Sequence, residues 1–153
     1  MDLIKAENKM LNLMEKHNIS NWSFGFDRAV KRLGHCIWMK NGRKVRKITL
    51  SRVMTESRSE KEVENTMLHE IAHAIDYETR GFSSHDNIWK EIALSIGCDG
   101  QRTNKVDKKI VKNNYKWLAI CSEHGVLGGW QRKPKDNKIC KKCGNKVKIK
   151  KNE

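Results

Sequence analysis

Three of the chain's six histidines fall within one stretch, "HEIAHAIDYETRGFSSH", residues 69–85. His69 and His73 are four residues apart, so on a helix both imidazoles lie on one face and can reach a single metal ion. Glu70 points about 100° away from His69, beside that ion. A carboxylate in this place suits a base that takes a proton from a metal-bound water. The pattern therefore predicts a catalytic zinc site with Glu70 as its base.

A catalytic zinc ion needs a third protein ligand and a fourth position that stays open to water. His85 comes a short loop after Gly81, which is expected to end the helix, and it begins the next predicted helix. Because the chain can turn back over the metal there, we predict His69, His73 and His85 as the ligands. Glu91, on the later helix, is the alternative third ligand.

Asp76 lies on the metal-facing side of the same helix, three residues after His73. It could accept a hydrogen bond from a ligand imidazole and so fix the tautomer of that ring. It could equally pair with Arg80, four residues further on. The residues alone leave both interpretations open.

A second group of metal-binding residues lies near the C-terminus, in "CSEH" and "CKKCG". Each segment spaces two ligands by two residues, and 15 residues separate the two pairs, which is typical of a zinc ribbon with a closed tetrahedral site. The alternative is an all-cysteine site in which Cys98 replaces His124. Cys36, and otherwise Cys98, are interpreted as buried thiols. The predicted structural ligands are Cys121, His124, Cys140 and Cys143.

Positive charge is concentrated in the C-terminal third of the chain. Residues 1–100 carry 16 Lys and Arg against 14 Asp and Glu, a net charge of +2, whereas residues 101–153 carry 16 against 4, a net charge of +12. We therefore predict two domains with these boundaries. A surplus of this size attracts polyanions, so we expect the second domain to bind nucleic acid.

The basic residues around the predicted ribbon suit phosphates, and an exposed tryptophan among them can stack on unpaired bases. Trp130 follows Gly128 and Gly129 at an expected turn, where stacking on a base and packing into the small core are both possible. The predicted nucleic-acid contacts are Arg132, Lys133, Lys135, Lys138, Lys141, Lys142 and Trp130.

Apolar spacing predicts an α+β fold in which helices and a small antiparallel sheet position the first site. An amphipathic helix is expected near the N-terminus, followed by three strand segments, "NWSFGFDRAV", "LGHCIWMK" and "KVRKITLS". "KNGRK" supplies a hairpin turn, and the last segment is our prediction for a sheet edge that aligns an extended peptide. Short strands are expected between the metal-binding segments of the ribbon.

The helix that carries the first two histidines is expected to begin at Ser59, because Ser59 and Glu62 form a capping box. An apolar stripe at helical spacing runs along its other side. A further helix is expected from Asp86 to Ile96, with Gly97 ending it.

Residues 67–98, "MLHEIAHAIDYETRGFSSHDNIWKEIALSIGC", resemble the SprT-like family, which includes the DNA-repair protease Spartan. Members have a HExxH helix, a third histidine after a loop and an aromatic residue four positions beyond it. The matching residues here are His69, Glu70, His73, His85 and Trp89. Asp86 departs from the family, which commonly has glycine after the third histidine.

The resemblance implies a zincin-like fold with an attached C-terminal ribbon, a zinc metallopeptidase activity, and protein substrates that are bound or crosslinked to DNA. It also agrees with two zinc ions per chain, one catalytic and one structural. The competing hypothesis is a non-enzymatic zinc-ribbon DNA-binding protein whose HExxH site is inactive or structural. Glu70 argues against it, because a purely structural site needs no such carboxylate.

Composition favours an intracellular, cytoplasmic protein. Five cysteines in a chain of this length suit a reducing compartment, where they serve as metal ligands or free thiols. The N-terminal segment is charged throughout and lacks the apolar core of a signal peptide. No apolar run approaches the ~20 residues that span a bilayer. We therefore expect no membrane partner, and we expect a monomer.

Overall fold

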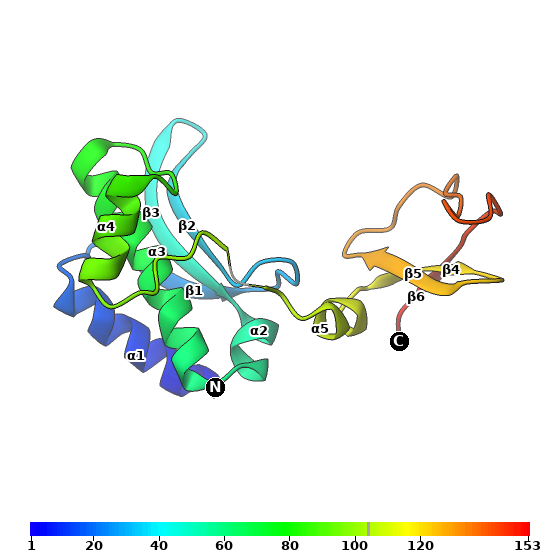
Figure 1. The fold of residues 1–153 in the computed structure, drawn as a ribbon, viewed down its shortest axis with the longest axis horizontal. Coiled ribbons are helices and arrows are strands. Elements are labelled where there is room, and N and C mark those ends of the chain that lie inside the picture. The colour runs from blue at the N-terminus through cyan, green and yellow to red at the C-terminus, as the bar shows by residue number, and fades with distance from the viewer. Residues whose placement is uncertain (104) are drawn as a thin grey trace. The chain divides into compact units, whose positions relative to one another are not determined.

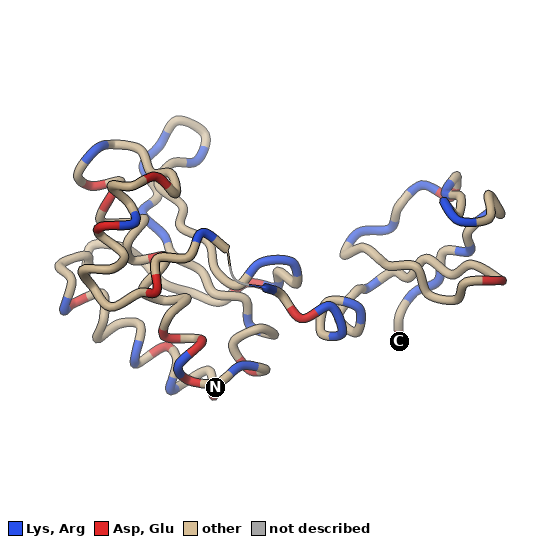
Figure 2. The backbone as a smooth tube through the Cα atoms, in the orientation of Figure 1, with Lys and Arg blue, Asp and Glu red and all other residues tan. Residues whose placement is uncertain are grey.

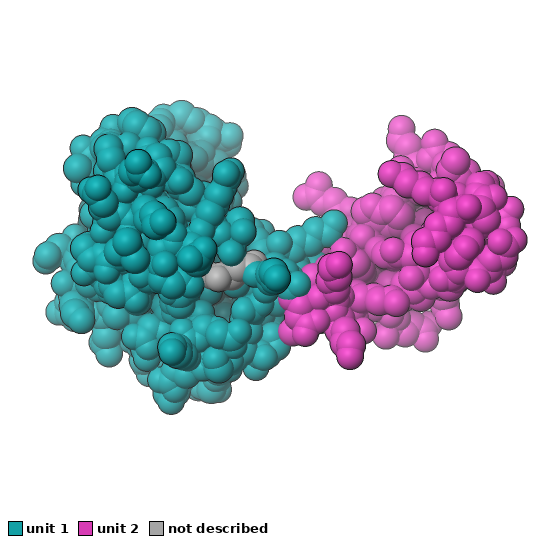
Figure 3. Space-filling model, in the orientation of Figure 1, with its two compact units in different colours: residues 1–106 teal, residues 107–153 magenta. Residues whose placement is uncertain are grey.

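The computed structural model describes residues 1–103 and 105–153 and divides the chain into two compact units, Met1–Val106 and Asp107–Glu153 (Figure 3). The boundary between the units lies after residue 106, whereas the charge distribution of the sequence predicted it after residue 100. Among the described residues, no helix combines the length and the apolar character needed to cross a membrane. Each unit has a hydrophobic core of its own.

In its described part, residues 1–103 and 105–106, the first unit combines four helices with one three-stranded sheet, which confirms the predicted α+β class. Figure 1 shows how these elements are arranged. Its elements are, in chain order, α1 (Leu3–Lys16), β1 (Ser23–Asp27), β2 (Gly34–Lys40), β3 (Arg43–Ser51), α2 (Arg52–Ser57), α3 (Glu60–Arg80) and α4 (Asn87–Ser95).

The strand order is β1-β3-β2, with β3 in the centre of the sheet. β2 and β3 form the expected antiparallel hairpin, in which Asn41 and Gly42 have positive φ angles of 52° and 74°, as a two-residue turn requires. β1 pairs with β3 in parallel, so the prediction of an antiparallel sheet is wrong for this pair. The prediction that "KVRKITLS" forms a sheet edge is also wrong, because β3 has neighbours on both sides. Apolar alternation shows which face of a strand is buried, but it does not show which strand lies beside it.

Helix α3 forms where its terminal signals predict. The Ser59 side chain accepts from the backbone N–H of Glu62, the Glu62 side chain reaches back to Ser59, and Gly81 ends the helix with a φ of 79°. One side of α3 packs against α1 and the sheet through buried apolar residues that include Met67 and Ile71. Another side packs against α4 through the cluster Leu68, Ala72, Trp89, Ala93 and Cys98. Packing on these sides holds α3 in place while its metal-site face remains accessible.

The second unit is small and basic (Figure 2). It consists of α5 (Lys108–Asn113), β4 (Trp117–Cys121), β5 (Gly125–Trp130) and β6 (Lys148–Lys151), with the antiparallel strand order β5-β4-β6. Its buried hydrophobic cluster comprises Ala119, Cys121, Cys140 and Val147. A core of this size rarely stabilises a fold unaided. Two of its four residues are cysteines, which suggests that a bound metal ion stabilises this unit.

Candidate metal centres and catalytic site

Three imidazoles converge at the accessible face of α3. His69 and His73 come from α3, and His85 comes from the loop between α3 and α4. The Nε2 atom of His85 lies 3.0 Å from Nε2 of His73 and 3.0 Å from Nε2 of His69. Zinc–nitrogen bonds of about 2.0–2.1 Å at tetrahedral angles would separate ligand nitrogens by roughly 3.3 Å. The arrangement therefore fits one zinc ion with three histidine ligands.

The protonation of these rings also suits a metal. Burial lowers the pKa of His73 to about 3 and that of His69 to about 4, and neighbouring imidazoles act in the same direction. The pKa of His85 is lowered as well, first by burial and then by the charge of Arg102. All three rings are therefore neutral at pH 7, which is the form that binds a metal ion.

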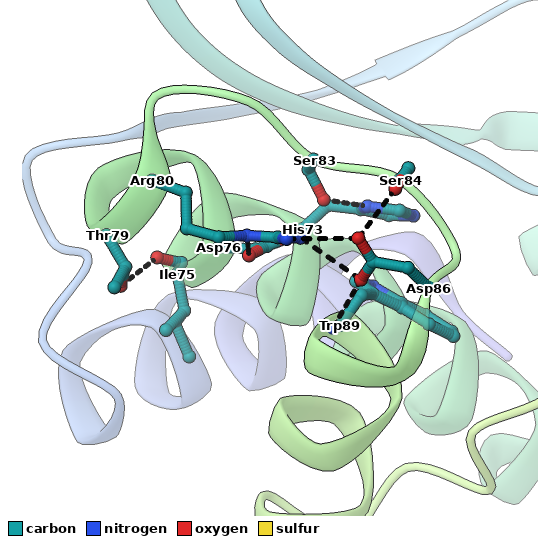
Figure 4. A network of polar contacts seen from close by, with 9 residues as sticks. All are labelled: His73, Ile75, Asp76, Thr79, Arg80, Ser83, Ser84, Asp86 and Trp89. Carbon is teal, nitrogen blue, oxygen red and sulfur yellow. Dashed lines mark hydrogen bonds and ion pairs between the residues drawn. The ribbon is translucent and has the colours of Figure 1, made fainter.

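Two further residues hold these imidazoles. The Ser83 hydroxyl lies 2.7 Å from Nδ1 of His73, so it can fix this ring with Nε2 directed at the metal (Figure 4). Trp89 is buried beneath the cluster, and the centroid of its ring lies 4.6–5.0 Å from those of all three histidines. Ser83 could not be identified from the sequence with the same ease as the histidines. Its place between a helix end and a predicted ligand was the only signal that could have indicated it.

Glu70 points from α3 toward the start of β2. Its side chain is buried, and burial raises its pKa to about 8, while the charge of Arg32 acts in the opposite direction. Gly34, the first residue of β2, leaves the space that the carboxylate occupies, because a Cβ atom at Gly34 would lie 2.7 Å from Oε1 of Glu70. A cavity of about 180 Å³ adjoins Glu70 and His69. The carboxylate therefore packs against Gly34 and lines this cavity.

The structure separates the alternatives that the sequence left open at this site. Asp76 is fully buried and its two oxygens accept from Arg80 at 2.6 and 2.7 Å, which favours pairing with Arg80 over contact with a ligand ring. Glu91 is exposed on α4 and lies outside the histidine cluster found among the described residues.

The second unit brings together Cys121, His124, Cys140 and Cys143, whose ligand atoms lie within 4.8 Å of one another. Sγ of Cys121 lies 3.6 Å from Nδ1 of His124 and 3.6 Å from Sγ of Cys143. Zinc–sulfur bonds of about 2.3 Å give separations of roughly 3.5–3.8 Å in a tetrahedron. The backbone N–H groups of Lys142 and Cys143 lower the pKa of Cys140, which favours its thiolate. These residues fit a closed structural zinc site.

Cys98 takes no part in this cluster. It is buried in the first unit, where it packs with Ala72 and Trp89. Burial raises the pKa of its thiol, as it does for Cys36. Both thiols are therefore protonated at neutral pH, and neither belongs to a cluster of candidate metal ligands among the described residues.

The basic residues predicted to contact nucleic acid are all exposed: Arg132, Lys133, Lys135, Lys138, Lys141 and Lys142. Lys138, Lys141 and Lys142 also line a cavity of about 390 Å³ together with Trp130 and apolar residues. Lys133 instead lies over the Trp117 ring, 5.5 Å from its centroid. Trp130 is half-buried, so it both packs on the small core and faces this cavity.

Comparison with known families identifies the first unit. A family model described as the SprT-like family matches residues 3–109, more than half of the chain. The chain belongs to the SprT-like family. No curated protein and no solved structure shows a match. The matched range covers the SprT-like domain, including His69, Glu70, His73 and His85, whereas the cysteine and histidine cluster of the ribbon lies beyond it.

Proposed function

We propose that the SprT-like domain is a zinc-dependent peptidase and that the basic ribbon binds DNA, so that its substrates are proteins bound or crosslinked to DNA. The observation that carries the first part is the buried Glu70 carboxylate, held against Gly34 beside three converging imidazoles. A structural site needs neither this carboxylate nor the adjoining cavity. Both features favour a peptidase over the competing non-enzymatic hypothesis.

His69, His73 and His85 would hold the zinc ion. When bound, zinc lowers the pKa of a coordinated water toward ~7 and polarises the substrate carbonyl. Glu70 accepts the proton of the attacking water at its carboxylate and then delivers it to the leaving amine. Burial alone raises the pKa of Glu70 to about 8, whereas the positive charge of a zinc ion at the three histidines would favour the carboxylate, the form that accepts this proton.

Substrate alignment is assigned to strand β2. Among the described strands, β2 pairs only with β3, so its other edge can accept a further strand. The strand begins at Gly34, where it meets Glu70. An extended peptide added to this edge would gain main-chain hydrogen bonds and pass beside the carboxylate.

Substitution of Gly34 tests how closely Glu70 must be held. In Gly34→Ala, the new Cβ atom would lie 2.7 Å from Oε1 and 2.8 Å from Cγ of Glu70, so the carboxylate must move. Because a misplacement of about 1 Å can cost roughly 10²-fold, we expect cleavage to slow by about that factor while zinc content stays unchanged. The matched control is Gly25→Ala in β1. There the new Cβ atom would meet only Cε of Lys47, at an ordinary contact distance of 3.8 Å. Equal rates in Gly34→Ala and wild type would show that Glu70 is not held by this glycine.

DNA binding is assigned to the cavity that Trp130 shares with three lysines. A base can stack on the half-buried indole, and Lys138, Lys141 and Lys142 can contact the flanking phosphates. Such phosphate contacts position a protein without reading sequence. Binding should therefore depend strongly on salt and weakly on sequence.

Charge reversal of Lys141 and Lys142 in the full chain tests this assignment. We expect weaker binding to all DNA sequences alike, with a salt dependence whose slope falls by roughly 0.7–0.9 for each phosphate that the protein no longer neutralises. The measurement is DNA affinity by fluorescence anisotropy at several salt concentrations. Reversal of Lys148 and Lys150 in β6 makes the same change in charge outside the cavity and should weaken binding less. Equal weakening in both variants would mean that DNA responds to the overall charge of the ribbon and not to a site at this cavity.

One experiment tests both the peptidase activity and its dependence on DNA. The zinc-loaded chain is incubated with a DNA-binding protein as substrate, with and without DNA. We expect cleavage, and we expect DNA to accelerate it, because the ribbon concentrates the peptidase on the same polymer as its substrate. In the variant with charge reversal at Lys141 and Lys142, DNA should no longer accelerate cleavage. Its cleavage rate in the absence of DNA should equal that of wild type. Absence of cleavage under every condition contradicts the peptidase, whereas cleavage without acceleration contradicts only the link to DNA.

A further inference from the structure

The end of α3 and the start of α4 are joined through one guanidinium group. Arg80 donates from Nε and Nη2 to the two oxygens of Asp76, at 2.6 and 2.7 Å. It also donates from Nη1 and Nη2 to the two oxygens of Asp86, at 3.0 and 3.1 Å. Asp76 is fully buried, and only 16% of the Arg80 side chain is exposed. Figure 4 shows the contacts of this guanidinium with both carboxylates. The Arg80–Asp76 pair is therefore unlike an ordinary surface ion pair, which is open to solvent and contributes little, whereas the Asp86 side chain is 39% exposed.

Asp86 anchors the second helix as well as the guanidinium. Its Oδ1 accepts the backbone N–H of Trp89 at 3.0 Å and so caps α4, and its Oδ2 accepts from the Ser84 hydroxyl at 3.0 Å. The two carboxylates therefore mark the two ends of one short connection. Asp76 belongs to the last turns of α3, and Asp86 is the N-cap of α4.

The connection between these anchors carries the groups that complete the metal site. Ser83 contacts Nδ1 of His73, and His85 supplies the third imidazole. Neither residue belongs to a helix, so their positions depend on how the ends of residues 81–85 are held. Gly81 gives the chain its reversal with a left-handed φ of 79°.

We infer that Asp76, Arg80 and Asp86 form a clamp that positions Ser83 and His85 for zinc binding. The clamp orders the loop before the metal arrives, so that less ordering has to accompany binding. Arginine is required because its planar fork can meet two carboxylates with four N–H bonds, whereas a lysine ammonium offers a point charge. All three members are positioning residues, since none of them is a ligand.

The test is the affinity of the three-histidine site for zinc, measured by competition with a chromophoric chelator on the full chain already holding one equivalent in the ribbon. In Arg80→Lys, the positive charge remains, but the side chain can no longer donate four hydrogen bonds to the two carboxylates. In Asp86→Ser, the hydroxyl can still cap α4 but cannot reach across to Arg80. We expect the second equivalent to bind roughly 10–100-fold more weakly in each variant, as for other groups that orient metal ligands, and the first equivalent to be unaffected.

The matched control is Arg52→Lys, which alters another arginine that pairs four residues along a helix, with Glu56 at 4.0 Å and far more exposed. It should bind both equivalents as wild type does. Circular dichroism of the metal-free variants reports whether they fold, and if Arg80→Lys does not, Asp86→Ser decides the question. Wild-type zinc affinity in a folded Asp86→Ser chain overturns the clamp, even if its melting temperature falls. Because the experiment measures zinc affinity and not cleavage, its result for the clamp does not depend on whether the chain is a peptidase.

Discussion

Glu70→Gln should retain both zinc ions and lose peptide-bond cleavage by about 10²–10⁴-fold or more. Glutamine keeps the size of the side chain, so it fits the space beside Gly34, but it cannot accept the proton of the attacking water. Cleavage of an unfolded protein such as casein, followed together with zinc content, measures both quantities on the same sample.

Glu91→Gln is the matched control, because Glu91 is an exposed carboxylate on α4 and was the alternative third ligand. It should change neither zinc content nor rate. Chelation should abolish the activity of wild type and of this control, and added zinc should restore it. If Glu70→Gln cleaved as fast as wild type, the peptidase assignment would fail.

Removal of a ribbon ligand should have the largest effect on folding. In Cys140→Ser, we expect one zinc equivalent to be released and residues 107–153 to unfold, while the SprT-like domain keeps its fold. The ribbon buries few apolar side chains, and two of them, Cys121 and Cys140, belong to the proposed zinc ligands. Structural zinc in finger peptides supplies on the order of 10–16 kcal/mol of apparent binding free energy, far more than such a core. Amide resonances in a ¹H–¹⁵N spectrum distinguish the two units.

Cys98→Ser provides the control for this variant and separates the two ligand sets that the sequence allowed. Cys98 is buried in the other unit, so its replacement should leave both zinc ions in place. A ribbon that stays folded in Cys140→Ser would mean that its core suffices without the metal. Release of the ribbon zinc in Cys98→Ser would instead restore the all-cysteine hypothesis.

The sequence could predict those features that depend on short-range signals. The capping box at Ser59 and the left-handed Gly81 fix the two ends of α3, and both are set within a few residues of the chain. Helical periodicity alone places His69 and His73 on one face. The short helices α2 and α5, six residues each, were missed because such lengths carry too little periodicity to stand out.

The features that were mispredicted or missed depend on contacts between distant parts of the chain. The alternation in β1 and β3 is the same for parallel and antiparallel pairing, so the position of β3 in the centre could not be predicted. Gly34 resembles any strand glycine until the fold brings Glu70, 36 positions further along the chain, against it. The role of Arg80 likewise appears only once Asp76 and Asp86 are seen on either side of it.

The most direct test of the central claim, an open catalytic zinc site, is a crystal structure of the zinc-loaded chain with anomalous diffraction at the zinc edge. We predict two peaks per chain. One should lie about 2.0–2.1 Å from Nε2 of His69, His73 and His85, with a water in the fourth position on the side of Glu70. A missing peak at the three histidines, or a fourth protein ligand that closes the site, would contradict a catalytic role.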